Sequence, residues 1–596
     1  MQSRTLWIVL GTIAATLLIC VVGAVATFVL LRPYIANVID GRQREAQVQP
    51  SPLAPSLATA EPTLENIPTE RPATPTVVVT PSASSRPSPP ATANPPTPAV
   101  QSSDDFATAL VAATQAELTN HPNVTRYQIQ ATLDPRTNTI VGEQQVQLTN
   151  TEDVALDEVY FRLYVNAPHY NEGGIVVDEV AVNGQVAQAA LELDDTALKV
   201  NLTQPLAPDQ TLTLSMRFTT TVPDSGGGYG IFNESNGTFT LYNWHPEVAV
   251  YENGDWLLNP VSDQGDPTNT DVANYAVTFV APEDYTVVTG GVETAAAPRD
   301  GNSAHSFIAP LTRNFVVVAS DQFERVTQQV GETTVASYYL PGDQQGGRAV
   351  LETASESLKL FSQQFGAYPF TELDVVEVQL GGGAAGMEAT GLIMISSEYY
   401  DQDAANALGG IGDAVPGAAG ADVLAFTTAH EVAHQWWYST VGSDAYQQPW
   451  LDESLTNWSS AYYVDEVVGD EAGLLARDLF IGLPYRSVLS RGDERLDQPV
   501  DTFSGEEYGA IVYGKGALMY DVLRQELGDQ AFFEFLQRYY QEQQFDRADG
   551  KEWLQTLNAV ADKDMTPFYE KWVVGDTITP ADLPPAGPLS RLFGGG

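Results

Sequence analysis

Cysteine and basic residues are scarce in this chain. One cysteine, Cys20, stands among 596 residues, so a disulfide framework and a cysteine nucleophile in the body of the chain are both excluded. Lysine and arginine number 28 against 76 acidic residues, which gives a formal net charge of -48 at pH 7. A surface of this sign repels nucleic acid phosphates and anionic membranes. The composition therefore predicts no nucleic acid partner.

Long apolar runs are also rare, and one of them lies at the start of the chain. The run from Leu6 to Leu31 is longer than the ~7–15-residue core of a signal peptide and long enough for a tilted membrane helix. Apolar residues continue beyond Ala24-Val25-Ala26, which resembles a cleavage site, and this favours an uncleaved anchor. The flanking arginines favour a cytoplasmic body, but large domains cross membranes largely regardless of such charges. We expect a single-pass membrane protein with an extracytoplasmic body.

Composition and periodicity divide the chain into segments. A Pro/Ser/Thr-rich stretch follows the apolar run and cannot form a core. Next, alternating apolar residues such as Tyr127, Ile129 and Ala131 predict half-buried strands, whose spacing favours a β-sandwich-like domain. From about Glu352 helical periodicity dominates. The expected boundaries are a flank 1–5, a membrane anchor 6–31, a disordered linker 32–104, a β-sandwich-like domain 105–325, a mainly helical domain 326–584 and a tail 585–596.

Two local patterns carry further expectations. A short helix is predicted for residues 105–118, and the Gly/Ala-rich stretch 404–421 predicts a mobile loop.

His430-Glu431-Val432-Ala433-His434 is the most informative motif, because histidine occurs only six times in the chain. On a helix, residues four apart share one face, so the two imidazoles can converge on one metal ion with Glu431 beside it. Glu453 opens a second expected helix and can supply a carboxylate ligand. Two histidines and one carboxylate leave a zinc position open for water, as in catalytic sites. Asp452 is the rival ligand to Glu453.

Four further stretches, together with the metal motif, resemble the aminopeptidase N family of zinc peptidases, the gluzincins that include leukotriene hydrolase. The resemblance covers most of the chain after the linker. The matching stretches are Trp244-His245-Pro246 with Val250 to Trp256, Gly386-Met387-Glu388-Ala389, Tyr508 to Gly516, and Phe568 to Trp572. The family implies a multidomain fold, with a β-sandwich-like N-terminal domain and a thermolysin-like α/β catalytic domain that ends in helices.

The resemblance also implies a role for each matched residue. One Zn²⁺ ion would be bound by His430, His434 and Glu453, with Glu431 as general base and Tyr513 as a hydrogen-bond donor to the oxyanion. Glu388 would bind the free amino terminus of a peptide substrate, beside Gly386, Met387 and Tyr508. Ala389 stands where the family commonly has asparagine. The second amine-binding residue of the family has no clear match, and Glu234 and Asn236 are neighbouring candidates.

These residues predict a membrane-anchored zinc aminopeptidase that acts on peptides with a free N-terminus. A zinc endopeptidase on the same scaffold and a non-catalytic surface binding protein are the alternatives. The sequence ends soon after Pro585, without the large C-terminal helical domain of many relatives. We therefore expect an open cleft that tolerates long peptides.

Overall fold

The part of the chain that the computed structural model describes comprises residues 103–224, 227–266, 268–400 and 423–593. These residues belong to one unit that runs from Ala99 to Gly596. The expected anchor at 6–31, nearly all of the expected linker and the Gly/Ala-rich stretch 404–421 lie outside the described residues.

The membrane localisation expected from the sequence is corrected by the structure. Within the described ranges, no helix combines the length and the apolar character needed to cross a bilayer. The apolar run from Leu6 to Leu31, on which that expectation rested, is not among the residues described.

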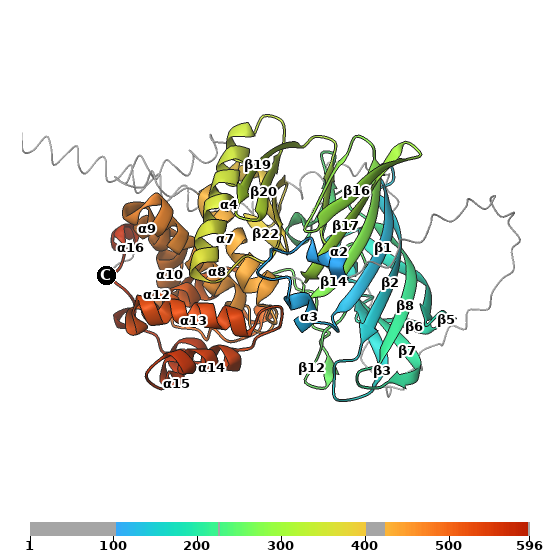
Figure 1. The fold of residues 1–596 in the computed structure, drawn as a ribbon. Coiled ribbons are helices and arrows are strands. Elements are labelled where there is room, and N and C mark those ends of the chain that lie inside the picture. The colour runs from blue at the N-terminus through green and yellow to red at the C-terminus, as the bar shows by residue number, and fades with distance from the viewer. Residues whose placement is uncertain (1–102, 225–226, 267, 401–422, 594–596) are drawn as a thin grey trace, which may run out of the picture. The chain divides into compact units, whose positions relative to one another are not determined.

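A large twisted sheet organises the N-terminal half, shown in cyan to green in Figure 1. In β1 (Thr125–Asp134), Tyr127, Ile129, Ala131 and Leu133 are buried and alternate with more exposed residues, as the period-two pattern predicted. The sheet order is β16-β17-β14-β1-β2-β8-β4-β5. Its other strands are β2 (Thr139–Thr149), β4 (Gly174–Val182), β5 (Gln185–Val186), β8 (Thr211–Thr221), β14 (Ala273–Pro282), β16 (Val292–Arg299) and β17 (Asn302–Thr312).

Two four-stranded sheets and a hairpin complete this β-rich domain. Their orders are β15-β18-β10-β9 and β11-β3-β7-β6, and β12 pairs with β13. The strands are β3 (Leu156–Arg162), β6 (Gln188–Glu192), β7 (Ala197–Leu206), β9 (Phe232–Ser235), β10 (Thr238–Leu241), β11 (Glu247–Val248), β12 (Tyr251–Glu252), β13 (Asp255–Trp256), β15 (Thr286–Thr289) and β18 (Val317–Ser320). Short 3₁₀ turns occur at η1 (Tyr164–Asn166), η2 (Pro168–Tyr170) and η3 (Gly228–Gly230).

The second half combines a five-stranded mixed sheet with helices. The sheet order is β19-β20-β21-β23-β22, so β22 is an edge strand. Its strands are β19 (Glu324–Val330), β20 (Thr333–Tyr339), β21 (Glu372–Val378), β22 (Gly386–Ala389) and β23 (Leu392–Ser396). The helix α4 (Gln344–Gln364) packs against β19 and β20 and against α7 (Val423–His434), as Figure 1 shows.

Helices continue from α7 to the end of the described chain, and several pass into π-helical turns. The α-helices are α8 (Trp450–Tyr463), α9 (Asp470–Arg477), α10 (Leu483–Leu489), α11 (Gly505–Tyr508), α12 (Gly516–Leu527), α13 (Asp529–Glu542), α14 (Gly550–Val560), α15 (Thr566–Tyr569) and α16 (Pro588–Phe593). The π-helical turns are η6 (Gln435–Thr440), η7 (Val464–Val468), η8 (Asp478–Gly482), η10 (Gly509–Lys515) and η11 (Glu570–Val574). The 3₁₀ turns are η4 (Ser397–Tyr399), η9 (Val500–Thr502) and η12 (Pro580–Asp582).

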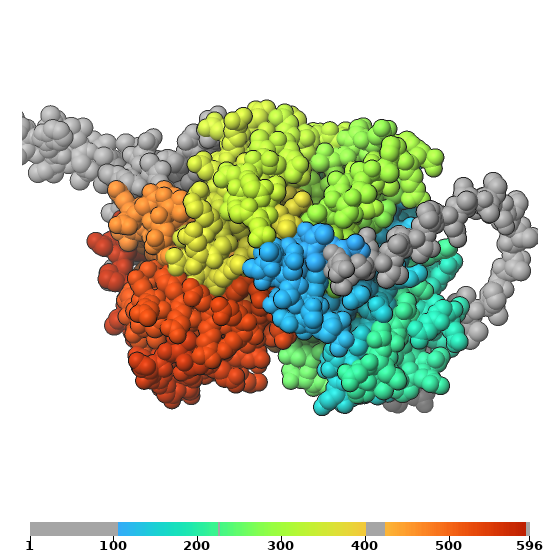
Figure 2. Space-filling view, viewed as in Figure 1, coloured from blue at the N-terminus to red at the C-terminus, as the bar shows by residue number. Residues whose placement is uncertain are grey.

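The helix expected at 105–118 is replaced by two short helices, α2 (Ser103–Ala107) and α3 (Glu117–Asn120). Between them, Leu110 forms a β-bridge with Phe370, and Val111 donates its N–H to the carbonyl of Pro369. These long-range bonds compete with helical ones and break the helix. Figure 2 shows this blue segment on the surface between the two halves.

The two hydrophobic cores meet at the edge strand β22. Met387 and Ala389 of β22 and Met394 of β23 belong to the core of the β-rich domain, although their backbones pair within the second sheet. The glutamate between them, Glu388, therefore lies at the junction of the two domains.

Candidate active site

The helices α7 and α8 bring together the three residues expected to bind metal. His430 Nε2 and His434 Nε2 lie 3.1 Å apart, and Glu453 Oε2 lies 3.2 Å from the first and 3.5 Å from the second. Ligands about 2 Å from a tetrahedral zinc ion lie roughly 3.3 Å from one another. The three donor atoms therefore have the spacing that one such ion requires.

Buried carboxyl groups crowd the place where the three expected metal-ligating atoms converge. Glu388, Glu431, Asp452 and Glu453 are each at most 4 % exposed. Burial raises the pKa of Glu431 to about 8, and burial likewise raises the pKa of Asp452 to about 6. Glu431 Oε2 and Glu388 Oε1 are buried without a hydrogen-bond partner among the described residues. A divalent cation fits this donor set because it would offset the excess of carboxylates.

The contacts between these side chains also shift the pKa values of the expected metal-ligating residues Glu453 and His434. Burial opposes ionisation of Glu453, but hydrogen bonds from His430 and His434 hold its pKa below the usual range. Burial also disfavours the charged form of His434, yet the carboxylates of Asp452 and Glu388 raise its pKa. Asp452 Oδ1 accepts a hydrogen bond from Nδ1 of His434 at 2.7 Å, on the side of the ring away from His430. Asp452 thus contacts the outer nitrogen, while Glu453 faces the converging pair.

Glu431 and Gly386 fit closely against each other. A Cβ atom added to Gly386 would lie 2.2 Å from Oε1 of Glu431, which is far inside van der Waals contact. The first residue of β22 must therefore lack a side chain for the Glu431 carboxylate to keep its position.

Glu388 lies on β22, with Oε2 3.9 Å from Nε2 of His434. A residue that the sequence analysis missed, Asp266, is buried beside it. Burial raises the pKa of Glu388, and the nearby charge of Asp266 raises it further. Burial raises the pKa of Asp266, and the nearby charge of Glu453 raises it further. Asp266 reaches the site from a loop between β13 and β14, where a Gly-Asp turn was its one sequence signal.

Tyr513 and Tyr508 form one wall of the site. The Tyr513 hydroxyl donates to Oε1 of Glu453, and its ring stacks on His430 with centroids 5.8 Å apart. The Tyr508 ring meets Tyr513 edge-on at 5.7 Å. Its buried hydroxyl has no hydrogen-bond partner among the described residues.

The neighbouring candidates Glu234 and Asn236 do not join the site. Glu234 Oε1 accepts from the N–H of Gly237 in a tight turn, and Asn236 donates to the side chain of Gln379. Glu234 therefore serves the β9–β10 turn, Asn236 ties this turn to Gln379, and Asp266 is the β-domain carboxylate beside Glu388.

A family model matches the part of the chain that carries this site. Residues 349–572 match the peptidase family M1 domain, and the resemblance to the aminopeptidase N family is confirmed over this region. The match begins in α4 and ends in η11, so it includes α7, α8 and η10.

Curated relatives and solved structures agree with this assignment. Aminopeptidase 2 of Candida albicans is 22% identical over 311 residues, 50% of this chain and 32% of that protein. Aminopeptidase N of Lactococcus lactis is 29% identical over 167 residues, 26% of this chain and 19% of that protein. The chain thus spans a third or less of the length of these curated relatives.

A crystal structure of an M1 zinc metallopeptidase from Deinococcus radiodurans superimposes with a TM-score of 0.56 at 19% identity. The superposition covers 78% of this chain and 96% of the other. This similarity confirms the expected multidomain fold, a β-rich domain followed by a domain that ends in helices.

Proposed function

We propose that this protein is a zinc metallo-aminopeptidase that removes N-terminal residues from peptides. The observation that carries the proposal is the convergence of His430, His434 and Glu453 next to the buried edge-strand carboxylate Glu388. The related structure bound to a Tyr-Ser-Ala substrate supports a peptide as the substrate class.

The metal ligands define the chemistry of the first step. A zinc ion held by His430, His434 and Glu453 would polarise the scissile carbonyl and acidify a water molecule. Glu431, which stands beside these ligands, would accept the proton of the attacking water and later return it to the leaving amine. Tyr513 donates a hydrogen bond to the oxygen on which negative charge develops.

The carboxylates of Glu388 and Asp266 select a free amino terminus. An α-ammonium group between them would donate two charge-assisted hydrogen bonds, one to each carboxylate, and would offset their mutual repulsion. Because Glu388 stands at a fixed distance from the metal ligands, such binding would place the first peptide bond at the reacting water. This selection favours an aminopeptidase over an endopeptidase.

The proposal is tested with aminoacyl fluorogenic amides that carry a free or an acetylated amino group. We expect hydrolysis of the free amides alone, loss of activity on chelation and recovery when zinc is returned. Glu388→Gln should lower kcat/KM by about 10²-fold while zinc content stays constant. Equal hydrolysis of acetylated peptides would instead identify an endopeptidase, and activity that persists after metal removal would reject the metal mechanism.

A further inference from the structure

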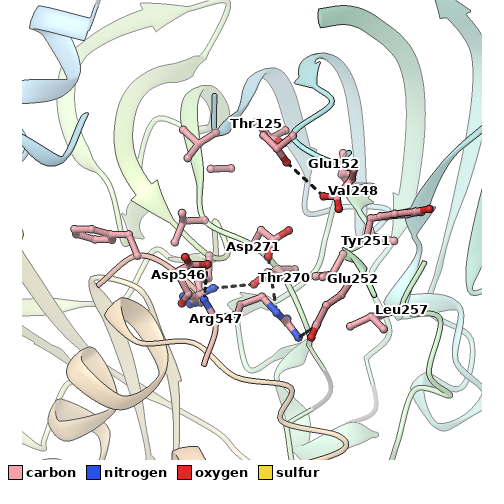
Figure 3. A pocket seen from close by; sticks show the side chains of 18 of the residues that line it. Thr125, Glu152, Val248, Tyr251, Glu252, Leu257, Thr270, Asp271, Asp546 and Arg547 are labelled. Atoms are coloured by element: carbon pink, nitrogen blue, oxygen red, sulfur yellow. Dashed lines mark hydrogen bonds and ion pairs between the residues drawn. The ribbon is translucent and has the colours of Figure 1, made fainter. Parts of the chain in front are cut away.

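A cavity of about 970 Å³ opens between the β-rich domain and two segments of the helical half. Its lining comes from the start of β1, from the β11–β13 region, and from residues 444–448 and 545–552. Figure 3 shows side chains from both halves pointing into it. The metal-binding residues and Glu388 are absent from its lining. It is therefore a cleft separate from the candidate active site.

Acidic side chains dominate this cleft. Two arginines, Arg313 and Arg547, also line it, but both already form hydrogen bonds or ion pairs with other groups of the protein. Arg313 donates to the backbone carbonyls of Thr270, Tyr438 and Asp546, and Arg547 lies 3.3 Å from Glu252 and 3.9 Å from Asp271. The carboxylates of the lining are Glu152, Glu252, Asp271, Asp444, Asp546, Asp549 and Glu552. The cleft thus keeps an excess of negative charge.

The carboxylates that line the cleft raise one another's pKa values. Burial raises the pKa of Glu152, and the charges of Asp271 and Glu252 raise it further. Burial raises the pKa of Glu552 in the same way, with contributions from Asp549, Asp546 and Glu252. Like charges held together at the wall of a concave surface focus a negative potential into it.

Two uncharged features of the lining also bear on the kind of ligand that the cleft can bind. The aromatic rings of Tyr251 and Trp256 meet edge-on at 5.1 Å in the wall. Thr270, labelled near the centre of Figure 3, is 8 % exposed, and its hydroxyl has no hydrogen-bond partner among the described residues. A buried polar group without a partner is costly, so this hydroxyl points to a ligand with hydrogen-bonding groups.

The spacing of the carboxylates decides between a metal ion and an organic cation. Among the described residues, the groups of three ligands close enough to hold a metal comprise only residues of the candidate active site. The carboxylates of the cleft are therefore too far apart to form a metal cage. Dispersed carboxylates beside aromatic rings suit guanidinium or ammonium groups carried on a larger molecule.

We propose that this cleft binds an organic cation with several guanidinium or ammonium groups. A basic peptide and a free polyamine share this chemistry, and the volume of the cleft accommodates more than one such group.

Calorimetric titration of the full chain tests the proposal with acetyl-triarginine amide, spermidine and acetyl-triglutamine amide. The acetyl group removes the free amine that Glu388 would recognise, so the titration with the arginine peptide is independent of the proposed peptidase activity. Spermidine keeps free amines, and its binding is assigned to the cleft by the variants described below. We expect saturable binding of a cationic probe, weakened by added salt, and none of the glutamine peptide. Binding of the arginine peptide alone identifies a peptide ligand, and binding of spermidine alone identifies a polyamine.

Matched variants locate the binding. The double variant Glu152→Gln with Asp271→Asn removes two charges from the cleft and leaves the Arg547–Glu252 pair intact. It should weaken binding about tenfold. The control, Glu534→Gln with Asp562→Asn, removes two exposed charges elsewhere and should leave binding unchanged. Equal weakening in both double variants, equal binding of the glutamine peptide, or no binding of either cation would overturn the proposal.

Discussion

Asp452 Oδ1 accepts a hydrogen bond from Nδ1 of His434 at 2.7 Å, and both side chains are 1 % exposed. This contact fixes the ring so that Nε2 faces His430 and Glu453. A carboxylate in this position orients a metal-binding imidazole and makes it a stronger ligand. Asp452, considered from the sequence as a rival ligand, is placed by the structure to support His434.

Asp452→Asn should therefore weaken zinc binding about 10- to 100-fold, because the amide retains an acceptor but loses the charge. Competition with a chromogenic chelator measures the affinity directly. At saturating zinc most of the activity should return. If zinc affinity is unchanged, the contact serves packing alone.

Gly386→Ala should lower kcat about 10- to 100-fold, since the added methyl group would displace the Glu431 carboxylate. Zinc content, measured by atomic absorption, should stay the same because the three ligands are untouched. Gly381→Ala, in the loop that precedes β22, is the control, because a Cβ there would have no contact shorter than 3.9 Å. Full activity of Gly386→Ala would exclude Glu431 as the base in its present position.

Tyr513→Phe should reduce kcat by about 10²–10³-fold with little change in KM, the pattern for a donor that acts in the transition state. Tyr508→Phe provides the comparison, because the Tyr508 hydroxyl has no protein partner among the described residues. Steady-state kinetics of the two variants separate the roles. A rise in KM alone for Tyr513→Phe would assign this residue to substrate binding.

Asp266→Asn should lower kcat/KM for free aminoacyl amides about tenfold, because one of the two carboxylates available to the ammonium group would be neutral. Asp263→Asn changes an exposed carboxylate of the same loop and should behave like the wild type. A variant series with free and acetylated substrates measures the selectivity. If Asp266→Asn affects both substrate types equally, it acts on catalysis or folding and not on the amino terminus.

Glu247 links pH to the stability of the β-rich domain. Burial raises its pKa from 4.5 to about 7, and one of its oxygens accepts from Asn243. Between these two values the unfolded chain releases a proton that the folded chain keeps, so this contribution to stability is complete below pH 4.5 and is lost as the pH rises through 7. Glu247→Gln should remove this dependence, a difference of about 1–3 kcal/mol between pH 5 and pH 8. Urea denaturation of both proteins at each pH measures it, and identical pH profiles would contradict it.

The sequence predicted the parts of the fold that local patterns encode. The alternation in β1 follows from periodicity, and the two metal-motif helices follow from the motif; both agree with the structure. The ligand and base roles of His430, His434, Glu453 and Glu431 stay predictions, supported by their convergence. Asp266 could not be found in this way, because a loop carboxylate more than 100 residues from Glu388 reaches it through tertiary packing alone. The π-helical turns, including η10 with Tyr513, also lack a sequence signature.

The edge strand β22 has its backbone in one domain and its buried apolar side chains, Met387 and Ala389, in the core of the other. If the junction of the two domains at β22 loosens, Glu388 and Gly386 would move relative to His430 and His434 before the helices α7 and α8 unfold. Enzymatic turnover would then disappear at lower denaturant concentrations than the far-ultraviolet circular dichroism signal. Peptidase activity would in that case report how tightly the two halves of the molecule are joined.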